Sequence, residues 1–148
     1  MPQSFTQLLH HVVFSTKSRE PWIAPEWKLE LYSFIGGVTR NRKGELLAAG
    51  GSADHVHLLL RLTPTRAVAD VIRDIKANSS GWLHERNVFP FAWQDGYGAF
   101  PLGPSGIRGV TAYINNQEAH HAQLSFNDER LALLSAAGAT DEEMAAWE

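Results

Sequence analysis

Two histidines, His55 and His57, are separated by one residue within a run of apolar side chains. A β-strand turns successive side chains to opposite faces, so the two imidazoles would lie side by side on one face. Val56 and Leu58 would then point the other way, into a core. Two imidazoles placed in this way can bind one cation. The solvated face of a half-buried strand gives the same pattern, so the pair alone leaves both interpretations open.

A second set of polar residues follows helical spacing. Tyr113, Asn116, Gln117 and His120 fall at i, i+3, i+4 and i+7, which places them on one stripe of a helix. Such a stripe is too polar for a core seam and is either a wet surface or a functional face. Set against the histidine pair, Gln117 could bring its amide oxygen to the same cation. Tyr113, one turn earlier, could then act as the nucleophile on a substrate atom that the cation polarises.

Several other residues have both a functional and a structural interpretation. Asp54 could orient a histidine through its carboxylate, or it could simply begin the strand. His120 and His121 could contact a phosphate or modulate Tyr113, or they could lie on the surface. Tyr97, between two glycines, is a rival nucleophile but is more typical of a packing residue. Candidate phosphate contacts, which solvated turns and helix ends explain equally well, are Arg42, Lys43, Arg73, Lys76, Ser79 and Ser80.

The order of elements predicts a fold that would position these groups. Strands are expected over residues 8–16, 45–50, 54–60 and 93–102, and helices over 26–40, 63–80 (with 82–87 as an extension) and 106–123. Short terminal helices are expected over 131–137 and 142–147. This β-α-β-β-α-β order is typical of an α+β, ferredoxin-like antiparallel sheet with two helices on one face. The added C-terminal helix, which would be the catalytic one, would cover the opposite face, where His55 and His57 lie.

Composition limits the class of protein. The chain has 148 residues and no cysteine, which excludes disulfides, thiolate zinc sites and cysteine nucleophiles. The net charge of −3 comes from an acidic helical tail, residues 128–148, while a domain of residues 1–127 is mildly basic. Any nucleic acid must therefore be held by shape, stacking and local contacts. We expect a soluble cytoplasmic protein that has no membrane partner, because the sequence has no signal peptide or spanning run.

Several motifs in register resemble a known family. The segments 54–59 (DHVHLL), 93–98 (WQDGYG) and 113–117 (YINNQ), the last followed by His120 and His121, resemble the small HUH single-tyrosine transposases of the IS-two-hundred type. These include the REP-associated tyrosine transposases. Segments 12–17 and 75–82 fit the same pattern, so the resemblance covers roughly residues 8–127. The acidic tail lies outside it, and residues 100–103 depart from the Ser-rich segment that is usual there.

The resemblance implies a metal-dependent enzyme that cleaves and transfers single-stranded DNA at hairpin-bearing ends. Tyr113 would form a 5′-phosphotyrosine intermediate, and His55, His57 and Gln117 would hold Mg²⁺ or Mn²⁺. Asp54, Asn116 and His120 would support them. The family also implies a homodimer, often with the tyrosine helix placed against the partner's histidines. The chemistry is reasonable, because a cation neutralises the phosphodiester and a phenol, with a reference pKa of ~10, ionises more readily than an alcohol.

Two other functions fit parts of the sequence. A ferredoxin-like sheet can bind nucleic acid without chemistry, although such modules usually present aromatic residues where this chain has histidines. A metallohydrolase could use His55 and His57 with an activated water, for which Asp54 offers the nearby carboxylate. A covalent tyrosine–DNA adduct would separate these functions from the transposase.

Overall fold

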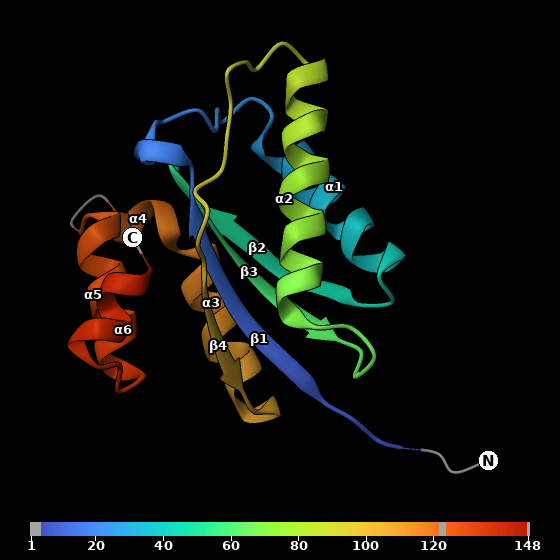
Figure 1. Ribbon diagram of the computed structural model, residues 1–148, viewed down its shortest axis with the longest axis vertical. Helices are drawn as coiled ribbons and strands as arrows, with labels where there is room; N and C mark the ends of the chain where they lie inside the picture. Colours follow the sequence, from blue (N-terminus) through green and yellow to red (C-terminus); the bar gives the residue numbers. More distant parts are fainter. Residues whose placement is uncertain (1–3, 122–123, 148) are drawn as a thin grey trace.

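A four-stranded antiparallel sheet forms the centre of the computed structural model, which describes residues 4–121 and 124–147. Its strands are β1 (Leu8–Ser15), β2 (Glu45–Gly51), β3 (His55–Leu62) and β4 (Gly98–Leu102), in the order β2-β3-β1-β4. Helices α1 (Lys28–Asn41) and α2 (Val68–Glu85) lie together on one face (Figure 1). This arrangement confirms the predicted α+β, ferredoxin-like fold.

The main core lies between the sheet and these two helices. Val12 and Phe14 of β1 and Val56, Leu58 and Leu60 of β3 are all fully buried there. The alternate residues of the same strands, which include His11, Val13, His55 and His57, therefore face the other side. The alternation predicted for the histidine strand is thus observed, and it extends to the neighbouring strand β1.

Four further helices cover that second face. They are α3 (Ile107–Asn115), α4 (Gln117–His121), α5 (Phe126–Ala136) and α6 (Asp141–Ala146), with short 3-10 turns η1 (Lys17–Arg19) and η2 (Pro104–Gly106) elsewhere. The helix expected over residues 106–123 is interrupted by a turn at Asn116, and its predicted end at residues 122–123 lies outside the described residues.

Other element boundaries also differ from the expectation. Helix α2 begins at Val68 rather than at Thr63, because Thr63 and Thr65 form a local turn in which the Thr65 amide donates to Thr63 Oγ1. Strand β4 is shorter than predicted, and Trp93 makes only an isolated bridge with Thr16. Helix α5 begins five residues earlier than expected.

The C-terminal helices share a second, smaller core with the sheet. It is formed by Val13 of β1, Phe126, Leu134 and Trp147. A methyl group at Gly98 would come within 2.6 Å of the Trp147 ring, so the absence of a side chain there admits the indole. The tail is thereby packed against β1 and β4. No helix among the described residues is both long and apolar enough to cross a membrane.

Candidate active site

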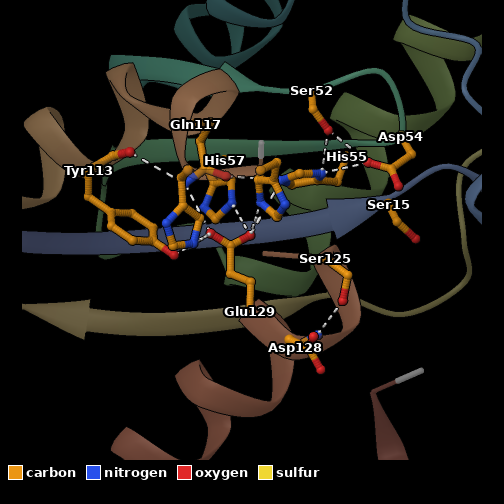
Figure 2. A network of polar contacts seen from close by, with 12 residues as sticks. Ser15, Ser52, Asp54, His55, His57, Tyr113, Gln117, Ser125, Asp128 and Glu129 are labelled. Atoms are coloured by element: carbon orange, nitrogen blue, oxygen red, sulfur yellow. Dashed lines mark hydrogen bonds and ion pairs between the residues drawn. The ribbon is translucent and has the colours of Figure 1, made fainter. Parts of the chain in front are cut away.

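His55 and His57 lie at the centre of a buried polar cluster (Figure 2). Each ring is oriented through its Nδ1 atom. His55 Nδ1 donates to Asp54 Oδ1 over 2.8 Å, and His57 Nδ1 shares a hydrogen bond of 2.8 Å with His11 Nε2. The Nε2 atoms of both rings therefore face the helices that cover the sheet. Asp54 lies where the sequence placed it, beside a histidine.

Tyr113 and Gln117 reach the same cluster from α3 and α4 of the same chain. The Tyr113 ring lies 5.6 Å from the His57 ring between centroids, and the phenol is partly buried. Gln117 is fully buried, and its Oε1 accepts from His55 Nε2 over 3.1 Å. The spatial convergence expected from the two motifs is present within one subunit.

Helix α3 can approach strand β2 closely because residue 50 of that strand is a glycine. Gly50 is the cross-strand neighbour of His57, and a methyl group there would lie 2.2 Å from the carbonyl oxygen of Ile114. The backbone of α3 therefore packs directly against β2, one residue from Tyr113. A side chain at position 50 would push the phenol away from the imidazoles.

The remaining members of the predicted helical stripe divide between the site and solvent. His120 is partly buried, with its Nε2 3.4 Å from a carboxylate oxygen of Glu129 and its ring 5.4 Å from that of Tyr113. Asn116 is exposed at the turn between α3 and α4. His121, four residues after Gln117 in α4, also faces the cluster.

Glu129 contacts the imidazoles of this cluster, the phenol and the Gln117 amide, and sequence reasoning did not find it. Its side chain is 1% exposed. Oε1 lies 2.9 Å from His121 Nε2, 3.0 Å from His57 Nε2 and 3.4 Å from His55 Nε2. Oε2 accepts hydrogen bonds from the Tyr113 hydroxyl and, over 3.0 Å, from Gln117 Nε2.

The sequence signal nearest to Glu129 is Ser125, a residue type that commonly begins a helix. The hydroxyl of Ser125 accepts the amide of Asp128 over 3.1 Å and caps α5. That cap places residue 129 one turn into a helix. It does not say which side chain the helix turns toward the histidines.

Burial and the shared carboxylate set the protonation of the cluster. Burial, together with the neighbouring His57, lowers the pKa of His11 to about 4. Burial also acts to lower the pKa of His55, but hydrogen bonds to Asp54 and Glu129 outweigh it and raise the pKa to about 9. Desolvation opposes ionisation of Glu129, yet hydrogen bonds from His55 and His57 hold the pKa of its carboxyl well below its usual range. Glu129 is therefore an anion.

Burial, followed by the hydrogen bond to Glu129, raises the pKa of the Tyr113 phenol above its ordinary value. The phenol is consequently a proton donor in this arrangement.

The donor set is chemically suited to a divalent metal ion. Ligand atoms of His55, His57, His121 and Glu129 all lie within 4.8 Å of one another, and the amide oxygen of Gln117 adjoins His55. Imidazole nitrogens with a carboxylate and an amide oxygen suit Mn²⁺ and Zn²⁺ as well as Mg²⁺. The predicted group of metal ligands thus fits a cation and is larger than expected.

The predicted DNA-contacting residues lie apart from this cluster, on α2 or at the turn after α1. Arg42 Nε donates to Asp74 Oδ2 over 2.5 Å, and Arg73 pairs with Asp70 at 3.3 Å. Lys43 is exposed in the turn, and Ser80 is partly buried on α2.

Two residues of that set are engaged inside the fold. Lys76 donates to the backbone carbonyls of Gln94, Asp95 and Gly96, and burial lowers its pKa to about 8. Ser79 is fully buried between Ile75, whose carbonyl it contacts, and the indole of Trp93. Ser79 therefore presents no exposed surface in this conformation.

Comparisons with known proteins bear on the fold and the family. No curated protein matches the chain. A candidate transposase from Deinococcus radiodurans R1 has a similar solved structure, with 22% identity, a TM-score of 0.62, and coverage of 79% of this chain and 98% of its own. A REP-associated tyrosine transposase, solved bound to a REP hairpin, has 16% identity, a TM-score of 0.62, and coverage of 84% and 74%. The sequence profile of the family described as "Transposase IS200 like" matches residues 4–117, so the chain belongs to the IS200-like transposases.

Proposed function

We propose that this transposase cleaves and rejoins single-stranded DNA at hairpin-bearing ends through Tyr113. The observation that carries the proposal is the convergence of the Tyr113 hydroxyl and the His57 imidazole on one carboxylate, Glu129, within a single chain. A nucleophile and a candidate cation site are thereby held against each other. Tyr113, His55, His57 and Gln117 lie within residues 4–117, the part of the chain that matches the family, whereas Glu129 lies after it.

The cation would be held by His55, His57 and Gln117. When bound, Mg²⁺ or Mn²⁺ would neutralise the anionic oxygens of the scissile phosphodiester and so make its phosphorus accessible to a nucleophile. Asp54 and His11 would fix the two imidazole rings, because each hydrogen bonds to an Nδ1 atom and leaves the Nε2 atom facing the site.

Tyr113 would supply the covalent chemistry. Its phenol oxygen forms a bond to phosphorus while the bond from phosphorus to the 3′-oxygen breaks, leaving a 5′-phosphotyrosine and a free 3′-hydroxyl. The phenol proton passes to solvent as the bond to phosphorus forms, while Oε2 of Glu129 orients the phenol through the hydrogen bond that it accepts, and the departing 3′-oxygen takes up one proton. Attack by another 3′-hydroxyl reverses these steps and joins the strands.

The expected partner is single-stranded DNA that carries a hairpin. A protein of similar fold was solved bound to a REP hairpin, which supports this choice of substrate. We propose that the enzyme acts on DNA in the cytoplasm, and that a homodimer would carry one complete site in each subunit.

The adduct itself is the test. A labelled hairpin oligonucleotide is incubated with protein and Mn²⁺, and covalent protein–DNA complexes are separated on a denaturing gel. We expect an adduct with the wild type and with Tyr97→Phe, the matched control. Tyr113→Phe should lose cleavage by on the order of 10⁴-fold or more. Cleavage that survives in Tyr113→Phe would eliminate this mechanism.

One observation favours a second candidate, metal-dependent hydrolysis of nucleic acid by an activated water. Glu129 supplies a buried carboxylate beside the histidine pair, which is the base that such a site requires. The same gel distinguishes it, because hydrolysis would continue in Tyr113→Phe and leave no adduct in the wild type. A non-catalytic binding module would give binding that is insensitive to EDTA and no cleavage at all.

A further inference from the structure

We propose that Glu129 is a ligand of the resident divalent cation in the resting enzyme, so that the C-terminal helix α5 completes the metal site. This inference rests on the proposed function for the presence of a cation, but not on the chemistry of Tyr113. Glu129 lies beyond residues 4–117, the part of the chain that matches the family. The ligand would therefore be supplied by the tail of this chain.

The spacing of the atoms around Oε1 fits coordination of one ion. Bonds of about 2.1 Å to nitrogen and oxygen put neighbouring ligands about 3.0 Å apart at a right angle and about 3.4 Å apart at the tetrahedral angle. Glu129 Oε1 lies 2.9 Å, 3.0 Å and 3.4 Å from three imidazole Nε2 atoms. Gln117 Oε1 lies 3.1 Å from His55 Nε2. These separations lie in the range expected for ligands of one ion, and the candidate ligand atoms of His55, His57, His121 and Glu129 all lie within 4.8 Å of one another.

The surroundings of the carboxylate also indicate an ion. A side chain that is 1% exposed has lost its water, and buried carboxylates are stabilised by paired charges or by coordinated metals. Here the contacting groups are imidazoles, a phenol and an amide, and imidazole is a neutral metal ligand once it has lost its proton. A divalent cation that displaced the imidazole protons would take over the stabilisation that the imidazole N–H groups now give this anion.

The two carboxylate oxygens have separate neighbours. Oε1 faces the imidazoles of His55, His57 and His121, whereas Oε2 faces the Tyr113 hydroxyl, the Gln117 amide and, at 3.4 Å, His120 Nε2. Coordination through Oε1 leaves the contact with the phenol in place. Glu129 would therefore link the cation to the nucleophile, and a nitrogen-rich site with one carboxylate favours Mn²⁺ over Mg²⁺.

Helix α5 is held firmly enough to present a ligand. Phe126 stacks on His55 with centroids 4.5 Å apart and planes at 26°. Arg130 Nη1 donates to the carbonyl of Met144 over 3.1 Å and also to that of Trp147, whose ring packs against Gly98. Coordination by Glu129 and docking of the tail are thereby coupled, so that each should strengthen the other.

Calorimetric titration of the metal-free protein with MnCl₂ tests the proposal without DNA. We expect Glu129→Gln, which keeps shape and loses charge, to weaken Mn²⁺ binding by at least roughly tenfold. Glu129→Asp should fall between it and the wild type, because the charge stays but the reach is shorter. Asp128→Asn is the matched control, since it removes the same charge from an exposed side chain of the same helix and should bind like the wild type.

Limited trypsin digestion gives a second readout. Cleavage after the buried Arg130 should slow when Mn²⁺ is added to the wild type, and should respond less in Glu129→Gln. Unchanged or tighter Mn²⁺ binding by Glu129→Gln would overturn the proposal, since the carboxylate would then not bind the ion or would compete with it. A wild type that binds Mn²⁺ through Glu129 but forms no DNA adduct would refute the proposed function and leave this inference standing.

Discussion

Replacing Gly50 by alanine should disable the site without touching any group that reacts. The new methyl carbon would lie 2.2 Å from the carbonyl oxygen of Ile114, whereas ordinary contacts begin at 3.4 Å. Helix α3 must therefore retreat from β2 by about 1 Å, and overpacking of this kind costs about 1–3 kcal/mol. Tyr113 follows Ile114 outward. A displacement of about 1 Å in a catalytic group can cost on the order of 10²-fold in rate.

Two measurements with one control separate this reasoning from a general loss of folding. The midpoint temperature of thermal unfolding should fall by roughly 3–10 °C in Gly50→Ala. The rate of adduct formation, measured at a temperature where the variant is folded, should fall about a hundredfold. Gly109→Ala, on the same helix, meets no atom within 4 Å and should keep both activity and stability. A Gly50→Ala protein that is as stable and as active as the wild type would show that α3 does not need this contact.

Three further predictions follow from the cluster. In the metal-free protein, the raised pKa of His55 makes the free energy of unfolding fall as pH rises from 6.5 towards about 9. The lowered pKa of His11 makes the free energy of unfolding fall as pH drops from 6.5 towards about 4. Urea unfolding across pH should therefore show greatest stability near pH 6.5, and a monotonic rise to pH 9 would contradict these shifts. Asp54→Asn should weaken Mn²⁺ binding by about 10–100-fold, because the ring of His55 loses its orienting carboxylate; unchanged calorimetric affinity would exclude that role. Mixing Tyr113→Phe with His57→Ala protein should not restore adduct formation, because both groups serve one site within a chain; recovery on mixing would demonstrate a site shared between subunits.

The sequence could predict the parts of this molecule that depend on short-range periodicity. Alternation along residues 55–62 correctly separates the core face from the histidine face, and the i, i+4 spacing of Tyr113 and Gln117 correctly places both on the side of the helix that meets the sheet. Each pattern repeats within a few residues. The spacing does not reveal the turn at Asn116, which interrupts the helix and leaves that side chain exposed.

Two of the DNA-contacting candidates have partners that the sequence pattern does not reveal. Polar side chains on a helix suggest a wet surface, but Ser79 and Lys76 use their polar atoms on Trp93 and on the carbonyls of residues 94–96. Those partners are distant in sequence, and nothing in the helix periodicity identifies them. A sequence pattern does not distinguish a serine whose hydroxyl is buried from one whose hydroxyl is exposed.

Glu129 is the hardest case, and it explains how the tail belongs to the site. It is separated from His57 by 72 residues and stands in an acidic segment whose composition suggests only a solvated surface. The residues that bring it inward are apolar: Phe126 stacks on His55, while Leu134 and Trp147 join Val13 in the second core. Burial of these apolar side chains stabilises the docked tail and so offsets the cost of burying one carboxylate in the imidazole cluster. A cation bound there would stabilise the docked tail further. The tail is therefore best understood as an element that positions one anion, which is why loss of its charge alone, in Glu129→Gln, is the most informative change in this protein.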